Sequence, residues 1–243
     1  MRAAARALLW PAVAAALAFA LLVGLGVWQL RRLDEKEALI ARIEQRASEA
    51  AQAIPPQDEW PALRPENYDF KRVRATGRFV AGRDALIFAP PPEGASREPG
   101  YLALTPFALA QGGVVLVDRG FLPGSQAADA SLRAAPSGEL AFEALMRAPQ
   151  GRNFFTPADE PKKGVFYTRD PAAIAAALGQ TAAAPFTLSL LAPLAGDGLR
   201  PIPQGAPSIV NNHLSYAITW FGLALSLLVI FALYAGGALG RSK

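Results

Sequence analysis

The sequence predicts a membrane protein in which two transmembrane α-helices, one near each end, flank a β-rich α+β domain outside the cytoplasm. Residues 7–30 and 213–239 form two long runs without Asp, Glu, Lys or Arg, and roughly 20 apolar residues in a helix cross a bilayer core. The mean hydropathy of +0.20 therefore averages two apolar ends and a polar middle. Within the middle, short apolar runs separated by Gly and Pro indicate strands.

The first apolar run, residues 7–30, follows Arg2 and Arg6. It shows no small-residue cleavage site after a shorter apolar core, so we interpret it as an uncleaved signal anchor and not as a secretory signal peptide. Residues 1–6 and residues 240–243 both carry positive charge, and the positive-inside rule places both in the cytoplasm. We therefore expect a multi-pass protein of the bacterial inner (plasma) membrane whose central domain is periplasmic.

Residues 31–54 are predicted to continue the first span as an amphipathic juxtamembrane helix. Leu33, Ile40 and Ile43 fall on one stripe of such a helix, with charged side chains elsewhere. Pro55 and Pro56 end the helical pattern. This stripe is expected to pack on the protein's own domain.

Residues 55–212 form the predicted periplasmic domain. One Ala-rich helix is predicted at 171–178, and it stops at Gly179. Strands are predicted at 68–80, 85–89, 101–109, 114–117, 140–146, 165–168 and 186–191. Short strands with turn-rich joints favour an antiparallel sheet or a small open barrel.

The composition excludes several function classes. The chain has no cysteine and one histidine, which excludes disulfides, thiolate chemistry, iron–sulfur clusters and any site with several histidines from one chain. No spacing fixes two carboxylates at a catalytic distance, so we expect no enzyme. The excess of positive charge is only +4 and is scattered, which favours contact with membrane lipid and no nucleic-acid partner.

Three segments stand out as motifs: Trp-Gln-Leu-Arg-Arg at 28–32, Val-Asp-Arg-Gly-Phe at 117–121, and His-Leu-Ser-Tyr-Ala-Ile-Thr-Trp-Phe at 213–221. Together and in this order they resemble the Surfeit locus protein one family, which comprises assembly factors for cytochrome c oxidase. The resemblance covers nearly the whole chain. That family more often has Asn at the position of Asp118.

The resemblance implies a non-enzymatic role in building the haem-a-containing core subunit of the oxidase, with haem A synthase as a second partner. Some bacterial members are thought to bind haem a, so haem a is the expected cofactor and His213 its expected iron ligand. On a helix, His213, Tyr216 and Trp220 fall at i, i+3 and i+7 and share a face. Arg31 and Arg119 are then candidates to pair with the haem propionates.

Other interpretations of the same residues stay open. His213 is also an ordinary residue for a helix start, Tyr216 and Trp220 suit an interfacial aromatic belt, and Arg119 suits a turn fixed by a nearby carboxylate. The alternative function is a two-span envelope scaffold or sensor whose periplasmic domain binds a protein or a ligand.

Two predictions concern the pairing of the spans. Trp28 and Gln29 are expected to line the interface between them. Small residues four apart, which allow helices to approach closely, occur at Ala16, Ala20 and Gly24 and at Gly222 and Ser226.

Overall fold

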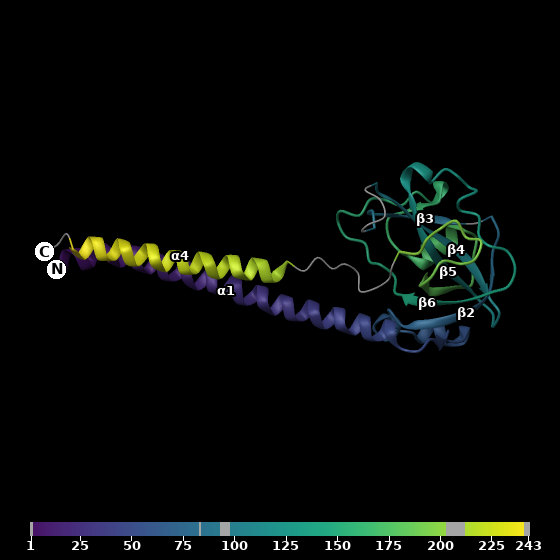
Figure 1. The fold of residues 1–243 in the computed structure, drawn as a ribbon, viewed down its shortest axis with the longest axis horizontal. Coiled ribbons are helices and arrows are strands. Elements are labelled where there is room, and N and C mark those ends of the chain that lie inside the picture. Colours follow the sequence, from purple (N-terminus) through teal and green to yellow (C-terminus); the bar gives the residue numbers. More distant parts are fainter. Residues whose placement is uncertain (1, 83, 93–97, 203–211, 241–243) are drawn as a thin grey trace. The chain divides into compact units, whose positions relative to one another are not determined.

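The structure is a computed structural model that describes residues 2–82, 84–92, 98–202 and 212–240 (Figure 1). The chain divides into two compact units. A helical unit comprises Met1–Arg42 and Pro207–Lys243, and a domain comprises Ile43–Ala206. Each unit is described by itself below.

The helical unit consists of two long helices that lie side by side (Figure 1). Helix α1 spans Arg2–Ser48, and helix α4 spans His213–Gly240. Both are long and apolar enough to cross a membrane, over Leu8–Ser48 and His213–Gly237. Two helices able to cross a membrane are therefore present at the predicted positions. The start of α1 and the end of α4 lie at the same end of this unit, so the two helices are antiparallel (Figure 1).

The predicted amphipathic segment is the second half of α1 and not a separate helix. It ends at Ser48, six residues before the predicted boundary, and Pro56 further along the chain has extended backbone. Ile43, on the predicted stripe, is buried. Arg46 ties the end of α1 to the domain, because its guanidinium donates to the main-chain oxygens of Asp69 and Glu66.

The two helices approach closely at Gly26. A Cβ atom at that position would lie 2.7 Å from the ring of Phe221, which is closer than real Cβ contacts. On α4, Ala217 and Ala224 are buried. The prediction that Gly24 and Gly222 allow a close helix approach is wrong. A Cβ atom added at either glycine would have no neighbouring atom within 4 Å. The close contact thus uses a different stripe of the same helices.

Within its described residues the domain has eight strands, three of which lie close to their predicted ranges. They are β1 Gln52–Ala53, β2 Arg72–Phe79, β3 Ala85–Ala89, β4 Gly100–Leu109, β5 Val114–Pro123, β6 Leu140–Arg147, β7 Val165–Phe166 and β8 Ala183–Leu190. The short helices are η1 Gln57–Ala62, α2 Pro65–Tyr68, η2 Gly124–Gln126, η3 Pro161–Lys163 and α3 Pro171–Ala177.

The strands form a small closed barrel. Their order is β1-β2-β6-β8-β5-β4-β3-β7. An additional pairing of β2 with β4 closes the strands β2-β6-β8-β5-β4 into a five-stranded barrel. The predicted β-rich α+β domain is confirmed. The sheet is mixed, because β5 pairs with β8 in parallel, and β1 and β7 also add as parallel edges.

Apolar side chains fill the barrel and a second layer outside it. Alternate residues of β2, such as Val73, Ala75 and Phe79, belong to the inner cluster, as period-2 strands require. Strand β5 is buried on both faces, since Val117 joins this inner cluster while Leu116 packs with Ile174 of α3. Burial on both faces explains why 114–117 has a continuous apolar run and no alternation.

The strand predicted from residue 68 begins only at Arg72. Pro65 occupies the first turn of the short helix α2, a position where its missing N–H costs nothing. Phe70 then has φ 65°, a left-handed conformation that interrupts extended backbone. Together these features delay the start of β2.

Candidate functional site

Two of the three sequence motifs lie in the helical unit, and a hydrogen-bond contact between His213 and Gln29 joins them. The Nδ1 atom of His213 lies 2.7 Å from Oε1 of Gln29. An amide oxygen only accepts hydrogen bonds, so Nδ1 is the donor when Oε1 of Gln29 is its partner. A neutral imidazole oriented by an acceptor on its other nitrogen is the usual form of a metal-ligating histidine.

Local packing brings these two side chains together. His213 opens α4, and Asn212 precedes it and accepts the main-chain N–H of Tyr216. Ala217, one turn after His213, is buried and presents little bulk to α1. Gly26, one turn before Gln29, leaves room for the ring of Phe221. Gln29 itself is 9% exposed, so the contact lies inside the helix pair.

The three residues predicted to share a face of α4 differ in exposure. His213 and Trp220 are half-buried, whereas Tyr216 is 55% exposed. The indole Nε1 of Trp220 is buried without a hydrogen-bond partner among the described residues. Arg31 is exposed on α1, two residues after Gln29. Of the two predicted interface residues, Gln29 is buried and Trp28 is half exposed.

Arg119 lies in the barrel domain, and its side chain is fully enclosed. It forms an ion pair with Asp197, with Nη1 2.9 Å from Oδ1. Its Nε donates to Oγ1 of Thr105 at 3.0 Å, and its other donors reach the main-chain oxygens of Arg133 and Ala134. This burial corrects the expectation that Arg119 offers its guanidinium to a haem propionate.

The ion pair of Arg119 with Asp197 matches the alternative interpretation, in which Arg119 fixes a turn by pairing with a nearby carboxylate. Gly120 has φ 141°, and a Cβ atom there would lie 2.1 Å from the main-chain oxygen of Arg200. Phe121 also bridges to Arg200. The Arg-Gly pair therefore holds the segment around residues 197–200 against β5. Asp197 was not identified from the sequence.

Comparison with known proteins assigns the chain to a family. It matches the SURF1 family over residues 16–225. The chain belongs to the SURF1 family. SURF1-like proteins of Monosiga brevicollis and Rickettsia conorii are 30% and 28% identical to it, over 86% and 89% of this chain and 81% and 87% of theirs. A SURF1-like protein of Drosophila melanogaster is 31% identical over 83% of this chain and 69% of its own.

The SURF1 family match runs from within α1 through the barrel and into the first half of α4. It includes Gln29, Arg119 and His213, one from each of the three motifs. The family resemblance carried by those motifs is therefore confirmed.

A polar cluster in the domain consists of Asp118, Arg147, Arg169 and Ser189, and it lies on the outer face of β5, β6 and β8. Asp118 is buried, and burial raises the pKa of its carboxyl, although Arg169 at 3.5 Å and a hydrogen bond donated by Ser189 oppose that rise. The pKa of Arg147 falls to about 10, mainly through burial and partly through the like charge of Arg169. This cluster pairs charges within the domain, since Arg169 lies near Asp118 and Arg147 near Asp69.

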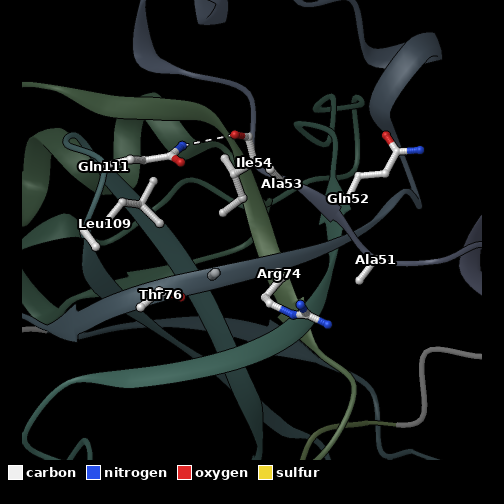
Figure 2. Close-up of a pocket in the computed structure, with 10 residues that line it drawn as sticks. Ala51, Gln52, Ala53, Ile54, Arg74, Thr76, Leu109 and Gln111 are labelled. Carbon is white, nitrogen blue, oxygen red and sulfur yellow. Dashed lines mark hydrogen bonds between the residues drawn. The ribbon is translucent and has the colours of Figure 1, made fainter.

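A cavity of about 300 Å³ opens beside β1 and β2 (Figure 2). It lies where the edge of β2 changes partner from β1, at Arg74, to β4, at Gly77. Gln111 lines the cavity, and its side-chain amide donates to the main-chain oxygen of Ile54 at 3.1 Å (Figure 2). None of the predicted site residues lines it. In the described part of the chain no three His, Asp or Glu residues are grouped to hold a metal ion.

Proposed function

We propose that this SURF1 family member is a non-enzymatic assembly factor for haem-a-containing cytochrome c oxidase, and that it assists haem a insertion into the core subunit. The observation that supports it most directly is the contact between His213 and Gln29, which joins two of the family motifs inside one helix pair. Both residues lie within the segment that the family shares.

The donor set fits haem better than a bare metal ion. The porphyrin supplies four nitrogen ligands, so haem needs only axial donors from protein, and imidazole is the usual one. Copper and zinc carriers need several soft or imidazole ligands, whereas this chain has one His and no Cys. When bound, haem a would supply redox chemistry that belongs to the oxidase.

In this proposal each residue of the helix pair has a distinct task. Gln29 holds the His213 ring so that Nε2 is its acceptor atom, and Ala217 keeps the two helices close enough for that contact. Tyr216 and Trp220 provide aromatic surface beside His213. Arg31, exposed next to Gln29, is the proposed partner of a propionate, a role that the enclosed Arg119 does not fill.

The proposal also includes a location and partners. The two long apolar helices support a membrane protein. We place it in the bacterial inner membrane, with both termini cytoplasmic, the barrel periplasmic and lipid around α1 and α4. The oxidase core subunit is the proposed client, and haem A synthase is the proposed donor of haem a.

The test of assembly is a reduced-minus-oxidised spectrum of membranes from a deletion strain. Wild-type protein should restore the haem a band, and His213→Ala should not. Ser215→Ala is the matched control, because Ser215 lies two residues away on α4 and is exposed. A band that never falls in the deletion strain would contradict the assembly role and favour the scaffold or sensor alternative.

Haem binding is tested separately on purified protein co-produced with haem A synthase. We expect bound haem in wild type and in Ser215→Ala, and its loss in His213→Ala. We also expect Gln29→Leu to shift the Soret band or lower occupancy, since losing the orienting acceptor costs typically 10–100-fold in affinity at metal sites. Full haem occupancy in His213→Ala would remove His213 as the ligand and leave the assembly role standing.

A further inference from the structure

Two phenylalanines stand out on the surface of the domain. Phe154 and Phe155, in the connection between β6 and β7, are 93% and 87% exposed. Among the large apolar side chains described in the domain, the next most exposed is Phe88, at 45%. The two rings contact each other edge to face, with centroids 5.4 Å apart. Exposed apolar surface of this kind marks a site of interaction.

The backbone that carries these rings is a hydrogen-bonded turn. Phe155 N–H donates to Oδ1 of Asn153 at 2.9 Å, and Thr156 N–H donates to the main-chain oxygen of Asn153 at 3.1 Å. The Oγ1 of Thr156 accepts the N–H of Asn153 at 3.0 Å. The turn is therefore built by its own polar side chains, while the aromatic pair remains outside.

The base of the turn is fixed to the domain. Arg152 forms an ion pair of 2.6 Å with Asp159, and Asp159 in turn accepts the N–H of Tyr167 at 2.8 Å. Gln150 N–H donates to the main-chain oxygen of Arg169 at 2.7 Å. A preorganised turn loses little conformational entropy when it binds, which makes it an efficient anchor.

The charge around the turn fits an anionic surface. Residues 150–163 contain three basic and two acidic side chains, so their net charge is +1. Both acidic side chains are paired, Asp159 with Arg152 and Glu160 with Lys163. Lys162 is exposed next to them. Aromatic side chains with basic neighbours are the usual composition of segments that enter the lipid headgroup region.

A bilayer is also the surface that is always available to this domain. The same chain carries two helices long and apolar enough to cross a membrane, so the domain is tethered to lipid. Tethering makes the second contact intramolecular and raises its effective concentration. A weak insertion of two rings is then sufficient to hold an orientation.

We propose that the Phe154-Phe155 turn inserts into the headgroup region of the bilayer and docks the barrel domain on the membrane. This membrane contact is independent of haem binding. It would fix the orientation in which the tethered domain faces its partners.

The absence of cysteine allows a direct test with one introduced thiol. Full-length Phe155→Cys protein, labelled with the environment-sensitive fluorophore NBD, is reconstituted into phosphatidylethanolamine–phosphatidylglycerol vesicles. Ser131→Cys, also exposed in the domain, is the matched control. We expect the label at 155, and not at 131, to emit at shorter wavelength and to be quenched by nitroxide-bearing lipid.

Phe154→Asp in the Phe155→Cys background should abolish both the emission shift and the quenching. Because both rings are outside the core, near-ultraviolet circular dichroism should show an unchanged fold. A label at 155 that behaves as in water in these vesicles would overturn the proposal. A label that becomes shielded only after addition of the oxidase core subunit would also overturn it, and would assign the turn to an apolar cleft on that protein.

Discussion

The Arg119 side chain links three separate segments of the domain through one guanidinium. It contacts Thr105 on β4, the main chain of Arg133 and Ala134, and the carboxylate of Asp197. Burying an ion pair costs desolvation, so such a pair contributes more to a defined arrangement than to net stability. Removing only one residue of a buried ion pair, however, leaves the other charge buried without its partner.

We predict that Arg119→Met lowers the free energy of unfolding by about 3–5 kcal/mol, because Asp197 would remain buried and unpaired. Arg74→Met is the matched control: Arg74 pairs with Glu143 at the surface, and such exposed pairs contribute little to stability. Denaturant unfolding of the detergent-solubilised protein measures both. Equal effects of the two substitutions would show that the Arg119 pair is not the internal brace described here.

Residues in the site differ in how far the sequence could identify them. His213 was identifiable because it is the only imidazole and lies at the start of an apolar helix. Gln29 could be assigned to the helix interface, but its hydrogen bond depends on the register of α1 against α4, which is a property of packing. Asp197 lies 78 residues from Arg119 in a segment without strand periodicity, so no local pattern marks their pairing.

At the scale of elements, the contact between α1 and α4 depends on which glycine faces the partner helix. Gly26 and Gly24 lie half a turn apart on α1. A Cβ atom at Gly26 would lie 2.7 Å from the Phe221 ring, whereas one at Gly24 would meet no atom within 4 Å. The two positions therefore form a matched pair for testing the helix contact.

Gly26→Leu is expected to destabilise the pairing of the helices by about 1–3 kcal/mol, the usual range for overpacking, while Gly24→Leu should have no effect. Cysteines placed at Ala18 and Ile230, which line one groove between α1 and α4, would report the pairing through a short bifunctional crosslinker. A lower yield in Gly26→Leu alone is the expected result. Equal yields in both variants would contradict the packing described for Gly26.

The strands were more predictable than their pairing. Residues 85–89 match β3 because Gly and Pro punctuate both ends, and Asp170 caps α3 at the predicted start of the helix. The parallel pairing of β5 with β8 was not predictable, since it joins segments about 70 residues apart along the chain. The closure of the barrel by β2 and β4 has the same long-range origin.

At the scale of the whole molecule, the residues that stabilise the fold and the residues of the proposed site belong to different units of the chain. The barrel, its inner apolar cluster and the Arg119 brace all lie within Ile43–Ala206. Gln29 and His213 both lie in the helical unit. A closed barrel pairs the long edges that would otherwise promote aggregation, so the domain has the features of an independently folding unit.

We therefore predict that a fragment comprising Ile43–Ala206 folds without the helices, with one cooperative thermal transition followed by near-ultraviolet circular dichroism. The same fragment, exported to the periplasm of a deletion strain, should neither retain haem a nor restore the oxidase band, because it lacks both Gln29 and His213. Arg119→Met in the fragment should lower its melting temperature, which ties the measured transition to the barrel. A folded fragment that did restore the band would move the function from the helix pair to the domain, and the His213 contact would then be structural.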